Sequence, residues 1–183
     1  YLEAVSDQTL LDLEDPDDTN GDGISGRVQL LDESDVIIEI DSTEKAMDAA
    51  TLNEFATRYT AAWCSQNAAS VAAFYADDGS LTINNGTPSV SRTAITAAAE
   101  GFMTSLPDMV VAMDSVSLED SRAVYRWTLT GSNTGPGGTG KSVRIKGSEE
   151  WTFNADGLIV YSDGHYDEAE YQRQLKSGAP PVP

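Results

Sequence analysis

The chain has 183 residues, of which 40% are hydrophobic; this suffices for one domain with a real core, and no apolar run is long enough to cross a membrane. Its formal net charge of −19 argues against binding nucleic acid or an anionic membrane, because both would repel the protein. The single cysteine, Cys64, excludes an internal disulfide framework and a metal site built from several cysteines.

The sequence divides into a leader, a domain and a tail. Residues 1–48 carry 15 acidic and 2 basic side chains, a net charge of −13, which leaves −6 for all other residues. Residues 36–40, VIIEI, predict a strand that would pair outside the leader, because the leader has little core of its own. Residues 49–176 form the predicted domain, and residues 177–183 form a Pro-rich tail. No signal peptide is visible at the start, so we expect a soluble, mature or trimmed form.

The leader contains the pattern D-x-N-x-D-G, which has the spacing of a calcium-binding loop. The oxygen ligands would come from Asp18, Asn20, Asp22, the Ile24 carbonyl and Gln29. Gln29 stands where such loops normally place a bidentate Glu, so we expect a reduced affinity for Ca²⁺. The alternative is a solvated acidic linker. A calcium site would favour an extracellular or periplasmic protein, with a cytoplasmic one left open.

From Ala49 the apolar pattern becomes helical. Residues 49–67 predict a helix whose buried face, at spacings of three and four, consists of Leu52, Phe55, Tyr59, Ala62 and Trp63. Residues 68–80 predict a second, short helix that ends near Asp77 to Gly79. After a Gly-Pro turn, residues 91–106 predict a third helix, which stops before Pro107.

The remaining residues alternate with the period of strands. Four strands are predicted over residues 109–119, 123–133, 142–153 and 158–167, and a last helix over residues 168–175. Three helices followed by a four-stranded antiparallel meander indicate an α+β fold. Alternation groups Tyr125, Trp127 and Leu129 on one face, and Glu149, Trp151 and Phe153 on another. We expect both faces to meet the helices.

Residues 135–142, GPGGTGKS, match the phosphate-loop pattern G-x-x-x-x-G-K-[ST]. That pattern binds phosphate only where a helix leaves the loop, because the N–H groups of the helix start hold the phosphates. Ser142 is followed by Val-Arg-Ile-Lys, which alternates apolar and basic residues as a strand does. We therefore interpret the match as a hairpin connection in which Gly and Pro turn the chain.

Residues 49–176 resemble the SnoaL-like polyketide cyclase family of the nuclear-transport-factor-2-like superfamily. The segments that carry the resemblance are YTAAWCSQNAASVAAFYADDGSL, LTGSNTGPGGTGKSVRIKG and DGLIVYSDGHYDEAEYQRQL. The resemblance implies a curved antiparallel sheet wrapped by helices into a cone, the cystatin-like α+β barrel, with a pocket for a small apolar molecule. It also implies a homodimer or higher homo-oligomer. Relatives include cyclases, isomerases and hydrolases that use acid–base chemistry without an organic cofactor.

The resemblance assigns the acid–base role of the cyclases to Asp167. Gln174 closes the same motif, whereas Gly164 stands where many relatives carry a further acid. Asn133 replaces a frequent His of the hairpin; its amide can donate a hydrogen bond but cannot shuttle a proton near neutral pH. Asp167 has a purely structural alternative, the N-cap of the last helix.

The residues by themselves suggest two further candidates. His165, the only histidine, shares a strand face with Asp163 and Asp167, which would hold it in one tautomer as a general base; the alternative is a surface His on an acidic strand. Glu149 shares its face with aromatic rings, and desolvation there should raise its pKa. Its alternative is a position at the rim or an ion pair with Arg126, Arg144 or Lys146. The aromatic residues expected in the core and pocket wall are Tyr59, Trp63, Trp127, Trp151, Phe153 and Tyr166.

These patterns leave two hypotheses for function. The first is a cofactor-independent enzyme that transfers protons on a small, partly apolar carbonyl compound, with Asp167 and Glu149 as acid–base groups and His165 and Asn133 orienting or polarising. The second is a non-catalytic ligand-binding or assembly module, in which the acidic leader, ordered by Ca²⁺, adds a strand to a neighbouring subunit.

Overall fold

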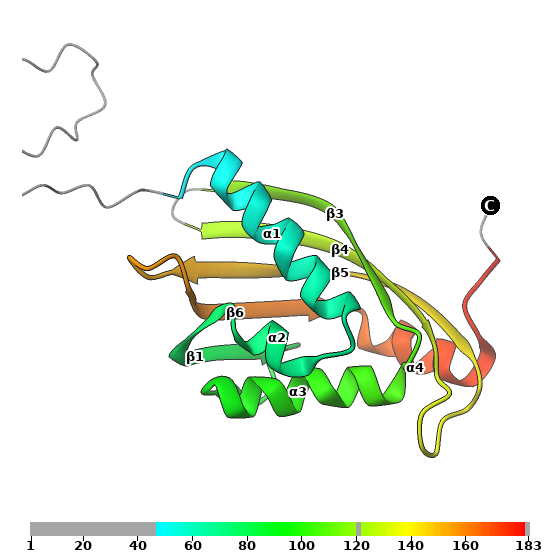
Figure 1. The fold of residues 1–183 in the computed structure, drawn as a ribbon. Coiled ribbons are helices and arrows are strands. Elements are labelled where there is room, and N and C mark those ends of the chain that lie inside the picture. Colours follow the sequence, from blue (N-terminus) through cyan, green and yellow to red (C-terminus); the bar gives the residue numbers. More distant parts are fainter. Residues whose placement is uncertain (1–46, 120–121, 182–183) are drawn as a thin grey trace, which may run out of the picture. The chain divides into compact units, whose positions relative to one another are not determined.

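The computed structural model of the protein describes residues 47–119 and 122–181 (Figure 1). Its helices are α1 (Ala49–Cys64), α2 (Ala68–Ala72), α3 (Arg92–Ser105) and α4 (Glu168–Ser177). Its strands are β1 (Tyr75–Ile83), β2 (Ser89–Val90), β3 (Val110–Glu119), β4 (Arg122–Ser132), β5 (Ser142–Phe153) and β6 (Ile159–Tyr166). Within these ranges no helix combines the length and the apolar character needed to span a bilayer. The predicted calcium loop and the strand over residues 36–40 lie outside the described residues.

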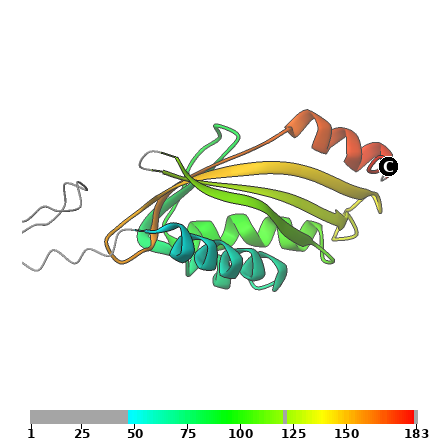
Figure 2. The ribbon, with the colours of Figure 1, turned by 90° about the horizontal axis from the view of Figure 1, so that it is seen from above.

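The six strands form one open, curled sheet in the order β2-β1-β6-β5-β4-β3. The predicted antiparallel meander is confirmed as β3 to β6. β1 and β2 extend the sheet beyond β6, and β1 runs parallel to β6. The helices α1, α2 and α3 cover one face of the sheet, whereas α4 lies on the other side (Figure 2). The α+β class and the curved sheet are confirmed, although the sheet does not close into a barrel.

The first and third helices form as their sequences predict. Asp48 caps α1 by accepting a hydrogen bond of 2.7 Å from the backbone N–H of Thr51, and Ser91 caps α3 in the same way through Ala94. The predicted apolar face of α1 is buried throughout, including Tyr59, which has no exposed surface. Burial of this face against the sheet holds α1 in place, because an isolated helix of its length is marginal in water.

The second helix is shorter than predicted, and this part of the prediction is wrong. α2 ends at Ala72, and the chain from Tyr75 onward is the strand β1. Tyr75 is fully buried, and β1 forms its ladder with β6. At Gly79, where the register shifts, an added Cβ would lie 2.8 Å from the carbonyl oxygen of Ile159. Pairing with a strand distant in sequence therefore overrides the helical pattern of the alanines.

The phosphate-loop match is the hairpin connection between β4 and β5, as predicted. β5 begins at Ser142, where a phosphate loop would need a helix. Gly137 and Gly140 adopt positive φ values of 75° and 72°, which glycine adopts without strain. Gly135 lies against the end of α3, where its N–H bonds the Ser105 carbonyl and a Cβ would overlap the carbonyl group of Thr104.

This packing predicts opposite effects for two glycine-to-alanine variants. Gly135→Ala should lower the free energy of unfolding by about 1–3 kcal/mol, because the new methyl group overlaps backbone. Gly101 is an exposed residue of α3, and no described atom lies within 4 Å of the Cβ that alanine would add. Gly101→Ala should therefore raise the free energy of unfolding by about 0.5–1 kcal/mol. Urea unfolding of the two variants measures both values. Equal stabilities for the two variants would contradict the described packing of the hairpin.

Candidate functional site

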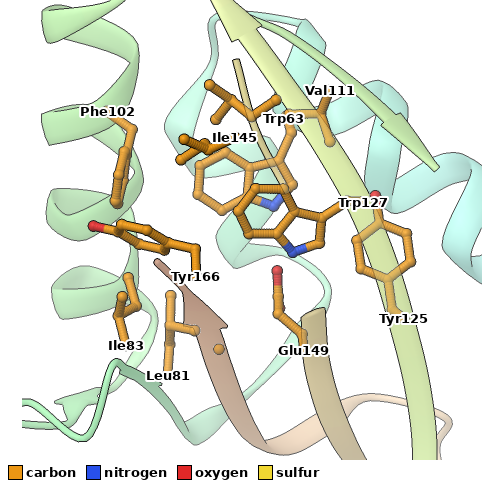
Figure 3. Close-up of a pocket in the computed structure, with 12 residues that line it drawn as sticks. Trp63, Leu81, Ile83, Phe102, Val111, Tyr125, Trp127, Ile145, Glu149 and Tyr166 are labelled. Carbon is orange, nitrogen blue, oxygen red and sulfur yellow. The ribbon is translucent and has the colours of Figure 1, made fainter. Parts of the chain in front are cut away.

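A cavity of about 50 Å³ lies between the helix-covered face of the sheet and the helices α1 and α3 (Figure 3). It is lined by Trp63, Leu81, Ile83, Phe102, Val111, Tyr125, Trp127, Leu129, Ile145, Glu149, Gly164 and Tyr166. The walls are almost entirely apolar and aromatic. Glu149 contributes the only carboxyl group among the lining residues.

The size of the cavity limits what it can enclose. A cavity of about 150 Å³ holds benzene, so a space one third as large holds a group of only a few non-hydrogen atoms. An apolar space of this kind excludes bulk water from whatever it holds, which strengthens electrostatic interactions inside it. The cavity is therefore suited to one small polar group with an apolar surround.

Glu149 points inward because β5 alternates its side chains, and its residue is only 7% exposed. Three donors reach a single carboxyl oxygen, Oε2. They are the Tyr59 hydroxyl at 2.9 Å, the Trp151 indole N–H at 3.0 Å and the Ser162 hydroxyl at 2.9 Å. Within the described part of the chain no hydrogen bond reaches Oε1. One oxygen thus anchors the side chain, and the other is unbonded within the described residues.

Burial raises the pKa of Glu149 above its ordinary value of 4.5, because the ionised form loses its hydration. The hydrogen bonds from Trp151, Ser162 and Tyr59 act in the opposite direction but do not outweigh burial. Burial, followed by the proximity of the Glu149 charge, also raises the pKa of Tyr59 and of Tyr75, whose hydroxyls lie 3.0 Å apart. Both phenols are therefore neutral donors. The predicted raised pKa of Glu149 is confirmed, and neither of its alternatives, the rim position or the ion pair, is found.

Trp127, on β4, forms the wall beside Glu149. It pairs across the sheet with Gly147, and its indole ring lies over that glycine. A Cβ at Gly147 would lie 2.7 Å from the His165 carbonyl oxygen and would overlap the six-membered part of the ring. The indole Nε1 of Trp127 is buried and has no hydrogen-bond partner among the described residues.

Three of the predicted catalytic residues do not line the cavity. His165 lies on the opposite face of β6, where its Nε2 is 3.2 Å from Asp163 Oδ2 and its side chain is 43% exposed. Asp167 is exposed and caps α4 by accepting a hydrogen bond of 2.9 Å from the Glu170 N–H. Asn133 holds the glycine-rich hairpin, through Thr139 N–H at 2.8 Å and the Ser105 carbonyl at 3.1 Å. These positions match the structural alternatives for His165 and Asp167.

The predicted pocket residues fall into two groups. Trp63, Trp127 and Tyr166 line the cavity. Tyr59 and Trp151 lie behind Glu149 and support it by hydrogen bonds, and Phe153 packs in the core with its ring centroid 6.1 Å from that of Trp151. The aromatic cluster therefore provides both a wall and a second layer that positions the carboxyl group.

Gly164 faces the cavity directly opposite Glu149 on the neighbouring strand. A Cβ at Gly164 would lie 3.5 Å from Glu149 Cγ, so the glycine leaves the space into which Glu149 extends. The resemblance expected an acid at position 164, and the chain instead supplies a carboxyl group from the adjacent strand. The sequence did not reveal this pairing, because the register of β5 against β6 shifts by a residue near Phe153.

Residues 56–162, more than half of the chain, match the family model of the SnoaL-like domain. The chain belongs to the SnoaL-like family. Among curated proteins, none matches the sequence closely enough to count as a relative. The SnoaL-like and nuclear-transport-factor-2-like fold includes polyketide cyclases and isomerases.

Three solved structures illustrate the shared fold. A protein of ketosteroid isomerase-like fold from Catenulispora acidiphila, bound to trimethylamine, is 14% identical and covers 69% of this chain and 98% of that chain, with a TM-score of 0.60. A protein from Jannaschia sp. assigned as a SnoaL-like polyketide cyclase is 16% identical, with a TM-score of 0.58. The match covers 73% of this chain and 99% of that chain. SalBIII, an epoxide hydrolase/cyclase-like enzyme with a role in pyran ring formation in salinomycin, is 11% identical, with a TM-score of 0.59. The match covers 68% of this chain and 96% of that chain. Identities this low establish the fold alone.

The raised pKa of Glu149 predicts a pH dependence of stability. Because folding favours the neutral form, its contribution is complete below an ordinary pKa of 4.5 and is lost as the pH rises through the folded-state pKa. Glu149→Gln stays neutral at every pH. The free energy of unfolding of the wild type, relative to this variant, should therefore fall as the pH rises above 4.5 and level off once the pH exceeds the raised folded-state pKa.

Urea unfolding at several pH values measures this difference. Glu150→Gln is the matched control, because residue 150 is the next along β5, points to the other face and forms a solvent-exposed ion pair with Arg122. The difference in free energy of unfolding between the wild type and Glu150→Gln should not fall as the pH rises. A pH-independent difference for Glu149→Gln would show that the carboxyl group titrates normally in the fold.

Proposed function

We propose that the protein is a cofactor-independent enzyme that transfers a proton at the carbon next to a carbonyl group, with Glu149 as its acid–base residue. The observation that carries this proposal is the position of Glu149: it is the only carboxyl group lining an apolar cavity, it is anchored through one oxygen, and it is left unbonded at the other. Burial raises the pKa of this carboxyl group, which makes its ionised form a stronger base than an ordinary glutamate.

The step that this geometry supports is an enolisation. Oε1 of ionised Glu149 takes a proton from the α-carbon, the C–H electron pair forms the carbon–carbon double bond, and the carbonyl π pair moves to oxygen. If the proton on Glu149 is first replaced by one from solvent, its return to the same carbon gives isotope exchange. Return of a proton to another carbon gives isomerisation, and either step regenerates the carboxylate. The donors at Oε2 hold the carboxyl group in one orientation, which keeps Oε1 directed at the ligand.

The comparisons support this class of reaction without selecting a substrate. Proteins of the same fold have been assigned as a polyketide cyclase and as an epoxide hydrolase/cyclase-like enzyme. The remaining predictions of the sequence stay predictions: Ca²⁺ in the leader, a homodimer or higher homo-oligomer, and an extracellular or periplasmic location. If the following experiment contradicts the enzyme proposal, the non-catalytic module is favoured instead.

The proposal predicts that the protein exchanges the α-protons of small ketones with solvent. Acetone, butanone and cyclopentanone in D₂O are the probes, and loss of their α-proton signals is followed by NMR. The wild type should exceed the rate of buffer alone, and Glu149→Gln should lower the protein-dependent rate by about 100-fold or more.

Glu150→Gln provides the control, because it makes the same substitution on the opposite face of β5. It should retain the wild-type rate. If all three ketones exchange no faster than in buffer, or if Glu149→Gln exchanges as fast as the wild type, Glu149 is not the acid–base group of a carbonyl reaction and a non-catalytic role follows.

A further inference from the structure

The unbonded oxygen of Glu149 keeps accessible surface inside the cavity. Among the described residues, two polar side-chain atoms are buried without a hydrogen-bond partner, Trp127 Nε1 and Asp163 Oδ1. Glu149 Oε1 also has no partner there, but it is not one of these two, so it is not fully buried. Figure 3 shows the Glu149 side chain extending from β5 into the space between the aromatic rings. A ligand in the cavity can therefore contact Oε1.

The described cavity wall holds no group that balances the charge of ionised Glu149. None of the residues that line the cavity is Lys, Arg or His. The titratable groups near Glu149 on the surrounding elements are the phenols of Tyr59 on α1, Tyr75 on β1 and Tyr125 on β4. Burial raises the pKa of each phenol, so all three stay neutral. An ionised carboxyl group without a countercharge is costly in an apolar interior, and a cation that enters the cavity would reduce that cost.

Aromatic rings surround the same space. They belong to Trp63, Phe102, Tyr125, Trp127 and Tyr166. The face of an aromatic ring is negative and attracts a cation that lies within about 6 Å of its centroid. Cages of such rings are a known means of holding ammonium groups. The formal net charge of −19 also raises the concentration of small cations at the protein surface.

We propose that the cavity binds a small monoalkylammonium ion, of which methylammonium is the simplest, through an ion pair with Glu149 Oε1 and contacts with the surrounding rings. A space of about 50 Å³ holds a few non-hydrogen atoms, which suits an ammonium group with one short carbon substituent. A quaternary ammonium ion is larger and has no N–H to donate to Oε1. A metal ion fits less well, because the described residues contain no group of three His, Cys, Asp or Glu side chains that could hold it.

This inference goes beyond the proposed function, because it requires neither a carbonyl compound nor turnover. The ammonium ion and the proton compete for Glu149. Burial holds the pKa of Glu149 above 4.5, and a cation that pairs with the ionised form lowers that pKa again. By linkage, the affinity for the cation is low where Glu149 is protonated and rises with pH until Glu149 is fully ionised.

The first test compares two probes of similar size in the wild-type protein, methylammonium chloride and methanol, of which only the first is charged. Binding is followed through the three tryptophan indole N–H signals in a ¹⁵N-resolved spectrum, with sodium chloride keeping the ionic strength constant. At mildly alkaline pH methylammonium should bind about 10- to 100-fold more tightly than methanol. Its affinity should fall as the pH is lowered toward 4.5. Equal affinities for the two probes, or a methylammonium affinity that ignores pH, overturns the inference.

The second test separates the carboxyl group from the rings. Glu149→Gln never ionises, so it should weaken methylammonium binding about 10-fold or more, remove its pH dependence and leave methanol binding unchanged. Glu150→Gln makes the same substitution on the opposite face of β5 and should bind both probes as the wild type does. If Glu149→Gln binds methylammonium as tightly as the wild type, the carboxyl group does not hold the cation and the inference is wrong.

Phe102 tests the rings, because it lines the cavity from α3 and is only partly buried. Phe102→Leu keeps an apolar wall but removes one ring. It should weaken methylammonium binding about 2- to 5-fold without changing methanol binding. An unchanged ratio of the two affinities in Phe102→Leu contradicts the contribution of the rings.

The cation site and the proposed function fail separately. Methylammonium should slow the exchange of butanone protons, because both the cation and the reaction need Glu149 Oε1. Saturable methylammonium binding without any protein-dependent exchange supports the cation site and ends the enzyme assignment. Exchange that depends on Glu149 and is not slowed by methylammonium overturns the cation site and supports the enzyme assignment.

Discussion

The burial of one carboxyl group, that of Glu149, is the constraint on which the rest of the site depends. An unpaired carboxyl group in an apolar interior costs several kcal/mol, unless it is neutral and hydrogen-bonded. The structure meets this condition with donors from three elements, Tyr59 on α1, Trp151 on β5 and Ser162 on β6. Helix and sheet must therefore pack in one arrangement for the carboxyl group to be satisfied, so the fold and the site are stabilised by the same bonds.

Two glycines of the sheet shape the cavity because they have no side chains. Gly164, opposite Glu149, leaves room for the carboxyl group, and Gly147, opposite Trp127, leaves room for the indole. Each glycine gives up packing in a strand interior, which is unfavourable by itself. Both glycines therefore leave space for side chains that line the cavity.

Local periodicity predicted the parts of the fold that local sequence determines. The buried face of α1, the strands β3 to β6 and the hairpin at Gly135 follow from spacing and turn residues, and the environment of Glu149 follows from its strand neighbours. The strand β1 was missed because its pairing with β6 is distant in sequence. Alternation correctly grouped Asp163 with His165, but it does not say which face of β6 is buried, and that face proved to belong to Ser162 and Gly164.

Among the described residues, two buried polar atoms lack a partner, Trp127 Nε1 and Asp163 Oδ1. The second belongs to a carboxyl group whose other oxygen, Oδ2, lies 3.2 Å from His165 Nε2 on the other face of the sheet. The first belongs to an indole ring that lines the cavity together with Glu149, whose pKa is raised by burial. Features that cost stability persist where the surrounding fold supports them, and their coincidence at one cavity is typical of a binding or catalytic site.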